Sequence, residues 1–330
     1  MPMAVVENQS SVRGSARELL ERRETGLLLV VLASSVILSL LTPRFLSINN
    51  FTSIATGMSY DVIMAIGMTL VLTVGGIDLS VGSILGLTGV VTTMLLRAGV
   101  PIPLAVLVGL SLGALLGAIN GTFIAKFQIN PFIVTLGMMA LARGASVVLT
   151  SGYFLSNLPP RYLAIGQGKW FGIPIPIYVA GLLVIVFDYL LRNWEPFHSI
   201  FYIGTNPDTA ELSGMKVGTM IIVCYVISGA LSALAGVFMT SRLAMGYAQF
   251  GLGAEQRAIA ASVIGGASMS GGEGSVVGAF LGVLLLAIIN NGFVLLNLSV
   301  YWQGVVNGLI LVLAVGVDAI RRARRGEIRD

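Results

Sequence analysis

The dominant feature of the sequence is a series of long apolar segments joined by short polar connections. A helix needs about 20 apolar residues to cross a bilayer, and by that measure the chain contains about ten transmembrane helices. The predicted spans are 25–42, 53–74, 79–97, 102–125, 130–151, 174–191, 217–240, 257–269, 275–296 and 300–320, of which 257–269 is the shortest. The expected fold is therefore an all-α polytopic membrane protein.

The overall composition excludes a soluble domain as the alternative. The chain is 56% hydrophobic and 10% charged, whereas soluble domains carry about 25% charged residues. Its mean hydropathy is +0.92. A net charge of +4 does not indicate nucleic-acid binding, because the excess arginines directly follow the last apolar segment.

The distribution of basic residues predicts the orientation of the spans. With the N-terminus inside, twelve of the 19 Lys and Arg residues fall on the cytoplasmic side and six on the opposite side. Positive charge is enriched in cytoplasmic connections. We therefore expect a cytoplasmic tail over 1–24, a transmembrane domain over 25–320 and a basic cytoplasmic tail over 321–330.

The sequence lacks the components of an active site. Cys224 is the only cysteine and His198 the only histidine, so neither a zinc cluster nor a disulfide framework is expected. Since no lysine is followed by Ser or Thr, the chain contains no nucleotide-binding P-loop. We expect no enzymatic activity, no metal and no bound cofactor.

A glycine-rich pattern occurs twice and suggests an internal repeat. Residues 75–82 (Gly-Gly-Ile-Asp-Leu-Ser-Val-Gly) share their glycine spacing with residues 271–278 (Gly-Gly-Glu-Gly-Ser-Val-Val-Gly). Paired, glycine-broken segments in two halves are typical of transporters built from repeats, although two unrelated glycine-rich turns would look the same. The positions concerned are Gly75, Gly76, Asp78 and Ser80 in the first copy and Gly271, Gly272 and Glu273 in the second.

The two acidic residues of this pattern, Asp78 and Glu273, are expected just before helix N-termini at the membrane boundary. The positive end of a helix dipole stabilises a carboxylate there, so a structural role comes first. A role in a cation pathway is the alternative, because acids near membrane depth are costly.

The most polar interior stretch, residues 193–216, is expected to form a cytoplasmic loop that contains a short helix. Asn206 is suited to the N-cap, Pro207 to the first helical position and Gly214 to the C-terminal stop. Such a helix outside the membrane offers a docking surface for a partner.

Three motifs together resemble one family, the ribose-type sugar permeases of bacterial ATP-binding-cassette importers. They are the segment 75–82, Asn290-Asn291-Gly292, and the cytoplasmic pattern Gly204-x-Asn206-x-x-x-Ala210-x-x-Ser213-Gly214. The similarity extends from about Leu27 to Arg321. The family usually has two adjacent alanines where this chain has Thr209-Ala210, a departure that affects docking details.

The resemblance implies a set of partners in the bacterial inner membrane. These are a second permease subunit, identical or not, a pair of cytoplasmic ATPase subunits that bind ATP-Mg, and a periplasmic or tethered sugar-binding protein. The helix from Asn206 to Gly214 would be the coupling helix that docks into the ATPase. Its candidate residues are Gly204, Asn206, Pro207, Ala210, Glu211, Ser213 and Gly214.

Polar residues inside apolar spans are candidates for the solute pathway. They are Asp61, Asn120, Arg143, Asn290 and Asn291. For the asparagines, hydrogen bonding between helices is the alternative role. Asp61 and Arg143 could neutralise one another or face water near the outer ends of their spans. The motifs do not specify the sugar.

A second hypothesis for the whole chain is an ion-coupled secondary transporter of a small polar solute that works alone. The source of energy distinguishes the two hypotheses, because only the importer needs an ATPase.

Overall fold

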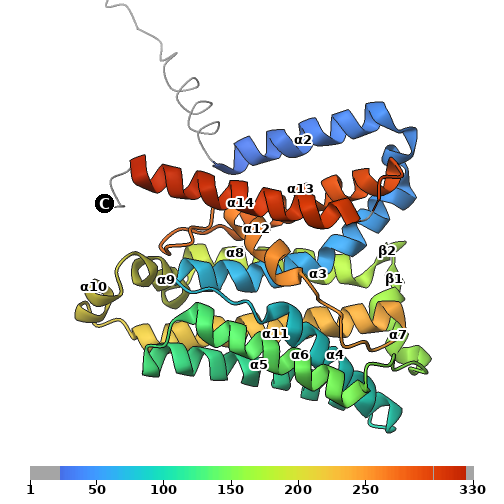
Figure 1. The fold of residues 1–330 in the computed structure, drawn as a ribbon, viewed down its shortest axis with the longest axis horizontal. Helices are drawn as coiled ribbons and strands as arrows, with labels where there is room; N and C mark the ends of the chain where they lie inside the picture. The colour runs from blue at the N-terminus through green and yellow to red at the C-terminus, as the bar shows by residue number, and fades with distance from the viewer. Residues whose placement is uncertain (1–22, 300, 325–330) are drawn as a thin grey trace, which may run out of the picture.

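The structure, a computed structural model, describes residues 23–299 and 301–324. In these ranges the chain forms a bundle of helices that lie side by side (Figure 1). The elements are α2 (Arg23–Leu41), η1 (Pro43–Leu46), α3 (Ile48–Thr73), α4 (Val81–Arg97), α5 (Ile102–Phe127), α6 (Pro131–Thr150), α7 (Pro160–Gln167), β1 (Lys169–Trp170), β2 (Ile173–Pro174), α8 (Ile175–Asn193), α9 (Glu195–Thr205), α10 (Pro207–Leu212), α11 (Val217–Leu243), α12 (Ala254–Ile264), α13 (Val276–Leu295) and α14 (Tyr301–Arg324).

The all-α membrane architecture predicted from the apolar segments is confirmed. Eight of the described helices are long and apolar enough to cross a membrane. They are α2, α3, α5, α6, α8, α11, α13 and α14. The predicted span 79–97 corresponds to α4, an apolar helix of 17 residues.

The predicted span 257–269 is wrong as a complete crossing. It corresponds to α12, which has 11 residues and therefore extends only about 16 Å. Glycines bound the helix at both ends: Gly253 precedes it with a φ of 72°, and Gly266 follows its last turn with a φ of 103°. These left-handed conformations end regular helix and are readily adopted by glycine.

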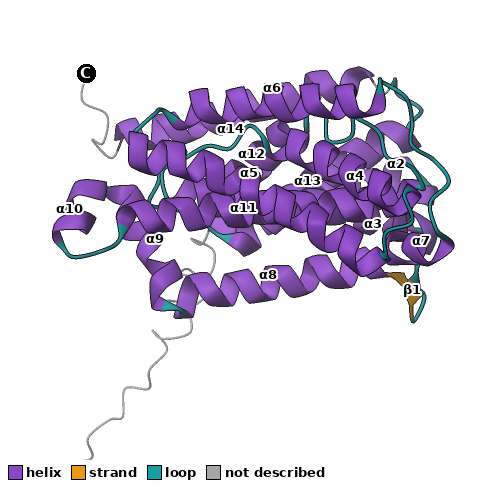
Figure 2. Ribbon diagram, turned by 90° about the horizontal axis from the view of Figure 1, so that it is seen from below, coloured by secondary structure: helices purple, strands orange, loops and turns teal. Residues whose placement is uncertain are grey.

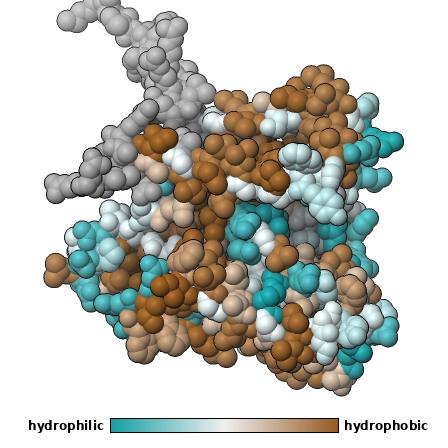
Figure 3. All heavy atoms as spheres, viewed as in Figure 1, coloured by the Kyte–Doolittle hydropathy of each residue, from teal (hydrophilic) through white to brown (hydrophobic). Residues whose placement is uncertain are grey.

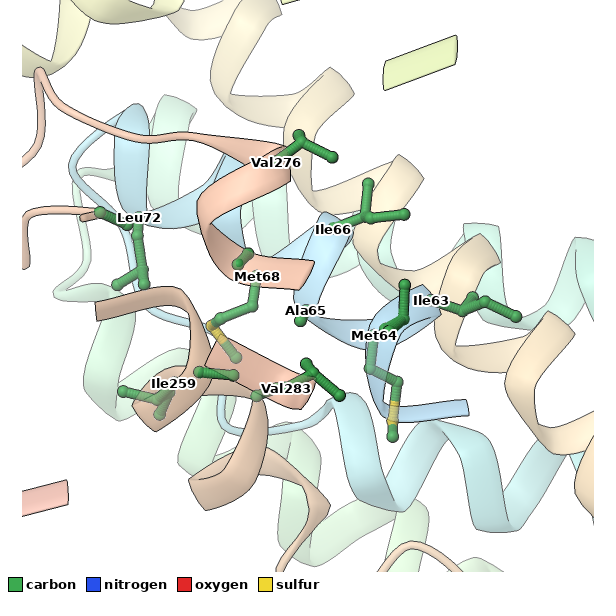
Figure 4. Close-up of a cluster of buried hydrophobic side chains, with 14 of the residues drawn as sticks. Ile63, Met64, Ala65, Ile66, Met68, Leu72, Ile259, Val276 and Val283 are labelled. Carbon is green, nitrogen blue, oxygen red and sulfur yellow. The ribbon is translucent and has the colours of Figure 1, made fainter. Parts of the chain in front are cut away.

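Helix α3 occupies the centre of the bundle because it is apolar on nearly every side. Its side chains from Val62 to Leu72 are almost entirely enclosed, as expected for a helix with no polar face. Figure 4 shows Met68 of α3 beside Ile259 of α12 and Val283 of α13. The second half of the chain thus packs around a helix from the first half.

Close backbone contact between α5 and α11 depends on glycine. A methyl group added to Gly117 would overlap the carbonyl oxygen of Tyr225, and one added to Gly113 would overlap that of Gly229. The small residues Gly113 and Gly117 therefore allow the two helices to pack closely.

The two ends of the bundle carry different extramembrane elements (Figures 1 and 2). One end bears α9 and α10, and the C-terminal end of α14 lies at the same end. The other end bears α7 and a hairpin in which Lys169 of β1 pairs with Pro174 of β2. The helices α7 and α9 were not anticipated, since both fall in stretches predicted only as connections.

Candidate functional site

The short helix predicted between Asn206 and Gly214 is present as α10. The Asn206 side chain accepts a hydrogen bond from the backbone N–H of Thr209 at 3.0 Å, so it caps the helix as its residue type indicated. Pro207 occupies the first turn. Gly214 has a φ of 84° directly after the helix, a conformation that favours glycine.

Helix α10 presents one buried residue and a mostly polar exposed surface. Ala210 is buried, which holds the helix against the bundle. Glu211, Ser213 and Gly214 are exposed, and Leu212 is 90% exposed. Leu212 was not among the predicted docking residues. Its apolar side chain near the end of a helix predicted to be exposed could have identified it as a contact for a partner.

Gly204 connects α9 to the rest of the bundle through direct backbone contact. A methyl group at this position would overlap the carbonyl oxygen of Thr73 and lie 2.5 Å from the backbone nitrogen of Gly272. That nitrogen donates a hydrogen bond to Thr73 at 2.9 Å. The end of α9, the end of α3 and the connection between α12 and α13 therefore meet with no space between them.

Both copies of the glycine pattern contribute to this contact. A methyl group on Gly271 would lie 2.9 Å from the Cα atoms of both Gly204 and Gly75. We call the four residues Gly75, Gly204, Gly271 and Gly272 the glycine junction. The two copies of the glycine pattern, 75–82 and 271–278, thus meet the cytoplasmic motif that begins at Gly204. They meet where the α9–α10 unit joins the transmembrane helices.

The two copies of the pattern do not play the same local role. Gly75 has a φ of 88° and its N–H bonds to the carbonyl of Leu72, so it ends α3. Helix α12 is ended earlier, where the N–H of Gly266 bonds to the carbonyl of Val263. Gly271 and Gly272 form a separate turn, with φ values of 87° and 78°. The internal repeat stays a prediction.

Asp78 lies in an enclosed cluster of hydrogen-bonding groups, three residues before the start of α4. Its carboxylate accepts hydrogen bonds from the backbone N–H and the hydroxyl of Ser80, at 3.0 and 2.6 Å, and from the hydroxyl of Ser228 at 2.9 Å. Asp78 is fully buried. It therefore ties the break between α3 and α4 to α11.

Two asparagines predicted for the pathway make hydrogen bonds to neighbouring elements. Asn120 is buried and donates to Ser80 at 3.0 Å. The side-chain amides of Asn291 and Asn50 exchange two hydrogen bonds, at 2.8 and 3.1 Å, between α13 and α3. Interhelical hydrogen bonding, the alternative considered for these residues, describes both.

Other predicted positions are only partly buried. Asn290 is partly buried, and its backbone carbonyl accepts a long hydrogen bond of 3.5 Å from Gln303. Glu273 is also partly buried, and its backbone carbonyl accepts from the N–H of Ser268 at 3.0 Å.

The suggested neutralisation of Asp61 by Arg143 is wrong. Asp61 pairs with Arg257 of α12 at 3.2 Å. Arg143 donates instead to the backbone carbonyls of Ala248 and Phe250, the latter at 2.8 Å. Spans predicted from a sequence give no information on which helices are neighbours, so the partner of Asp61 could not be identified.

Comparison with known proteins identifies the family. The family described as branched-chain amino acid transport system / permease component matches residues 50–315. The chain belongs to this permease family. This membership and the sugar-permease relatives described next together confirm the resemblance inferred from the motifs. The family and the apolar helices make the chain a multi-pass protein of the inner membrane.

Several curated relatives of the permease are sugar permeases. The ribose import permease protein of Haemophilus influenzae is 37% identical over 95% of this chain and 98% of its own length. The L-arabinose permease protein of Azospirillum brasilense is 33% identical over 95% and 92%. The D-allose permease protein of Escherichia coli is 36% identical over 86% and 87%. No solved structure matches the chain significantly.

Proposed function

We propose that this permease is the membrane-spanning subunit of an ATP-binding-cassette importer for a monosaccharide. A sugar-binding protein delivers the solute, and separate ATPase subunits supply the energy. The names of the relatives, for ribose, L-arabinose and D-allose, support this substrate class. The observation that carries the proposal is α10, a capped helix that projects from one end of the bundle with an exposed leucine at its tip (Figure 1).

The same proposal sets the orientation and the partners. If α10 docks on a cytoplasmic ATPase that binds ATP-Mg, the end of the bundle that bears α10 faces the cytoplasm. The start of α2 belongs to this end, because Glu24 accepts a hydrogen bond from Ser275 at 2.5 Å and lies 3.8 Å from Arg192. Both termini are then cytoplasmic, and a second permease subunit completes the membrane part.

The glycine junction provides a direct route for movement from the ATPase into the membrane. Helices α9 and α10 are joined by a single residue, Asn206. The end of α9 contacts the backbone of Thr73 and Gly272 without an intervening side chain. Since closely packed elements transmit displacement, a shift of α10 would reach the inner ends of α3 and of the connection before α13.

Replacing Leu212 with Asp should release the ATPase and leave the permease folded. Burial of a leucine at an interface contributes about 1.5–3 kcal/mol, so we expect the ATPase to bind at least roughly 10-fold more weakly. The measurement is co-purification of co-expressed ATPase subunits, with the melting temperature of the purified permease as a check on folding.

The matched control is Phe171→Asp in the hairpin at the opposite end. Phe171 is 98% exposed, so its replacement changes a similarly accessible apolar residue far from α10. Equal retention of the ATPase by the two variants would contradict docking through α10.

A further inference from the structure

The first turn of α12 lies near the middle of the membrane-spanning bundle. Asp61 is at the centre of α3, a helix of 26 residues that extends about 39 Å. Its partner Arg257, 3.2 Å away, is on the first turn of α12. This short helix therefore covers only the half of the bundle from its middle to the end that bears α10.

The segment 244–253, between α11 and α12, covers the other half without forming a helix. It follows α4 along its length. A methyl group on Gly246 would lie 2.8 Å from the hydroxyl of Thr93, near the end of α4, and one on Gly86 would lie 2.9 Å from the carbonyl oxygen of Phe250. Gly251 is in backbone contact with Gly82, in the first turn of α4.

The N-terminal ends of α4, which has 17 residues, and of α12, which has 11, thus meet inside the bundle. Non-helical backbone at this depth is tolerated only where protein buries it or where it lines a watery space. Two backbone carbonyls of this non-helical segment, those of Ala248 and Phe250, accept hydrogen bonds from Arg143. The rest of the segment includes side chains exposed at the surface of the bundle.

Three side chains are exposed along this segment and the first turn of α12: Leu252, which is apolar, and two glutamines. Gln249 in the segment and Gln256 in the first turn of α12 are both exposed. Figure 3 shows a hydrophilic patch near the middle of the face where α12 lies in Figure 1, with hydrophobic residues above and below it. Amide side chains at mid-membrane depth are unfavourable against acyl chains, which indicates a surface that faces water or solute.

The charges around these glutamines are matched within the chain. Arg257 is paired with Asp61. The Glu255 carboxylate interacts electrostatically with both Arg143 and Arg257, and it lies beside Gly82 at the N-terminal end of α4. Two cations, Arg143 and Arg257, therefore lie among two carboxylates, Asp61 and Glu255, next to Gln256.

We propose that segment 244–253 and the first turn of α12 form the surface that the solute contacts midway through the membrane. Gln249 and Gln256 are the contact residues, since each offers both a donor and an acceptor to hydroxyl groups. The balanced charge favours a neutral, polyhydroxylated solute over an ion. This inference rests on the proposed transport function and adds the place and the chemistry of contact.

Cysteine labelling in membranes that contain the assembled transporter tests the proposal. Gln249→Cys and Gln256→Cys are compared with Leu182→Cys, an exposed apolar position (60%) in the middle of α8. The native Cys224 is buried and provides an unreactive background. We expect a membrane-impermeant methanethiosulfonate reagent to modify the two glutamine positions on the order of 100-fold faster than position 182, because thiols react as thiolates in water.

Modification of either glutamine position should also block ATP-driven uptake of D-ribose, L-arabinose or D-allose, and modification at position 182 should not. Labelling rates within a few fold of the control, with and without ATP, would overturn the inference. So would rapid labelling that leaves uptake unchanged. Because labelling requires no transported sugar, failure of the wild-type permease to take up any of the three sugars would count against the proposed function separately.

Discussion

Replacing Gly204 with Ala is expected to abolish sugar uptake and to destabilise the permease. The added methyl group would overlap the carbonyl oxygen of Thr73, and the nearby nitrogen of Gly272 is also backbone. Neither group can turn aside as a flexible side chain would. Overpacking of this kind costs about 1–3 kcal/mol or more, and α9 must shift away from α3 to relieve it.

The effect is measured as ATP-driven uptake in proteoliposomes together with the melting temperature of the purified permease. Gly181→Ala in α8 is the matched control, because no heavy atom lies within 4 Å of the methyl group that it adds. That variant should keep uptake and gain slightly in stability, as alanine favours helix over glycine. If the two variants behaved alike, the glycine junction would not be the tight contact described here.

Replacing Asp78 with Ala should have the second large effect, through loss of the cluster that links α3, α4 and α11. The backbone N–H and hydroxyl of Ser80 and the hydroxyl of Ser228 would all lose their acceptor. Each buried donor left without a partner costs about 1–3 kcal/mol. We therefore expect a loss of at least about 3 kcal/mol in the free energy of unfolding.

Thermal unfolding of the purified permease measures this loss. Asp208→Ala, at an exposed position of α10, is the control and should leave the melting temperature unchanged. Asp78→Asn keeps one oxygen acceptor and should fall between the wild type and Asp78→Ala. An Asp78→Ala variant as stable as the wild type would show that the cluster contributes little.

The features predicted correctly from the sequence are those determined by local pattern. Long apolar runs require membrane-spanning helices whatever their neighbours are. Helix α10 could be predicted to within a residue or two because Asn206, Pro207 and Gly214 each have a strong positional preference at helix ends.

The features that were missed or wrong depend on which elements meet in space. The glycine junction joins Gly75, Gly204 and Gly271, and nothing in their local sequences specifies that contact. The pairing of Asp61 with Arg257 was likewise not predictable, because 257–269 was interpreted as a full span with Arg257 at its outer end. Helix α12 has only 11 residues, so Arg257 in its first turn lies near the middle of the bundle, beside Asp61.

The most direct test of the proposed function is uptake by the reconstituted transporter. The permease, its ATPase subunits and its sugar-binding protein are placed in proteoliposomes, and uptake of D-ribose, L-arabinose and D-allose is followed with ionophores that collapse all ion gradients. We predict that uptake of at least one sugar requires ATP and persists under these conditions. Accumulation by the permease alone, driven by an ion gradient and indifferent to ATP, would contradict the importer and support a secondary transporter.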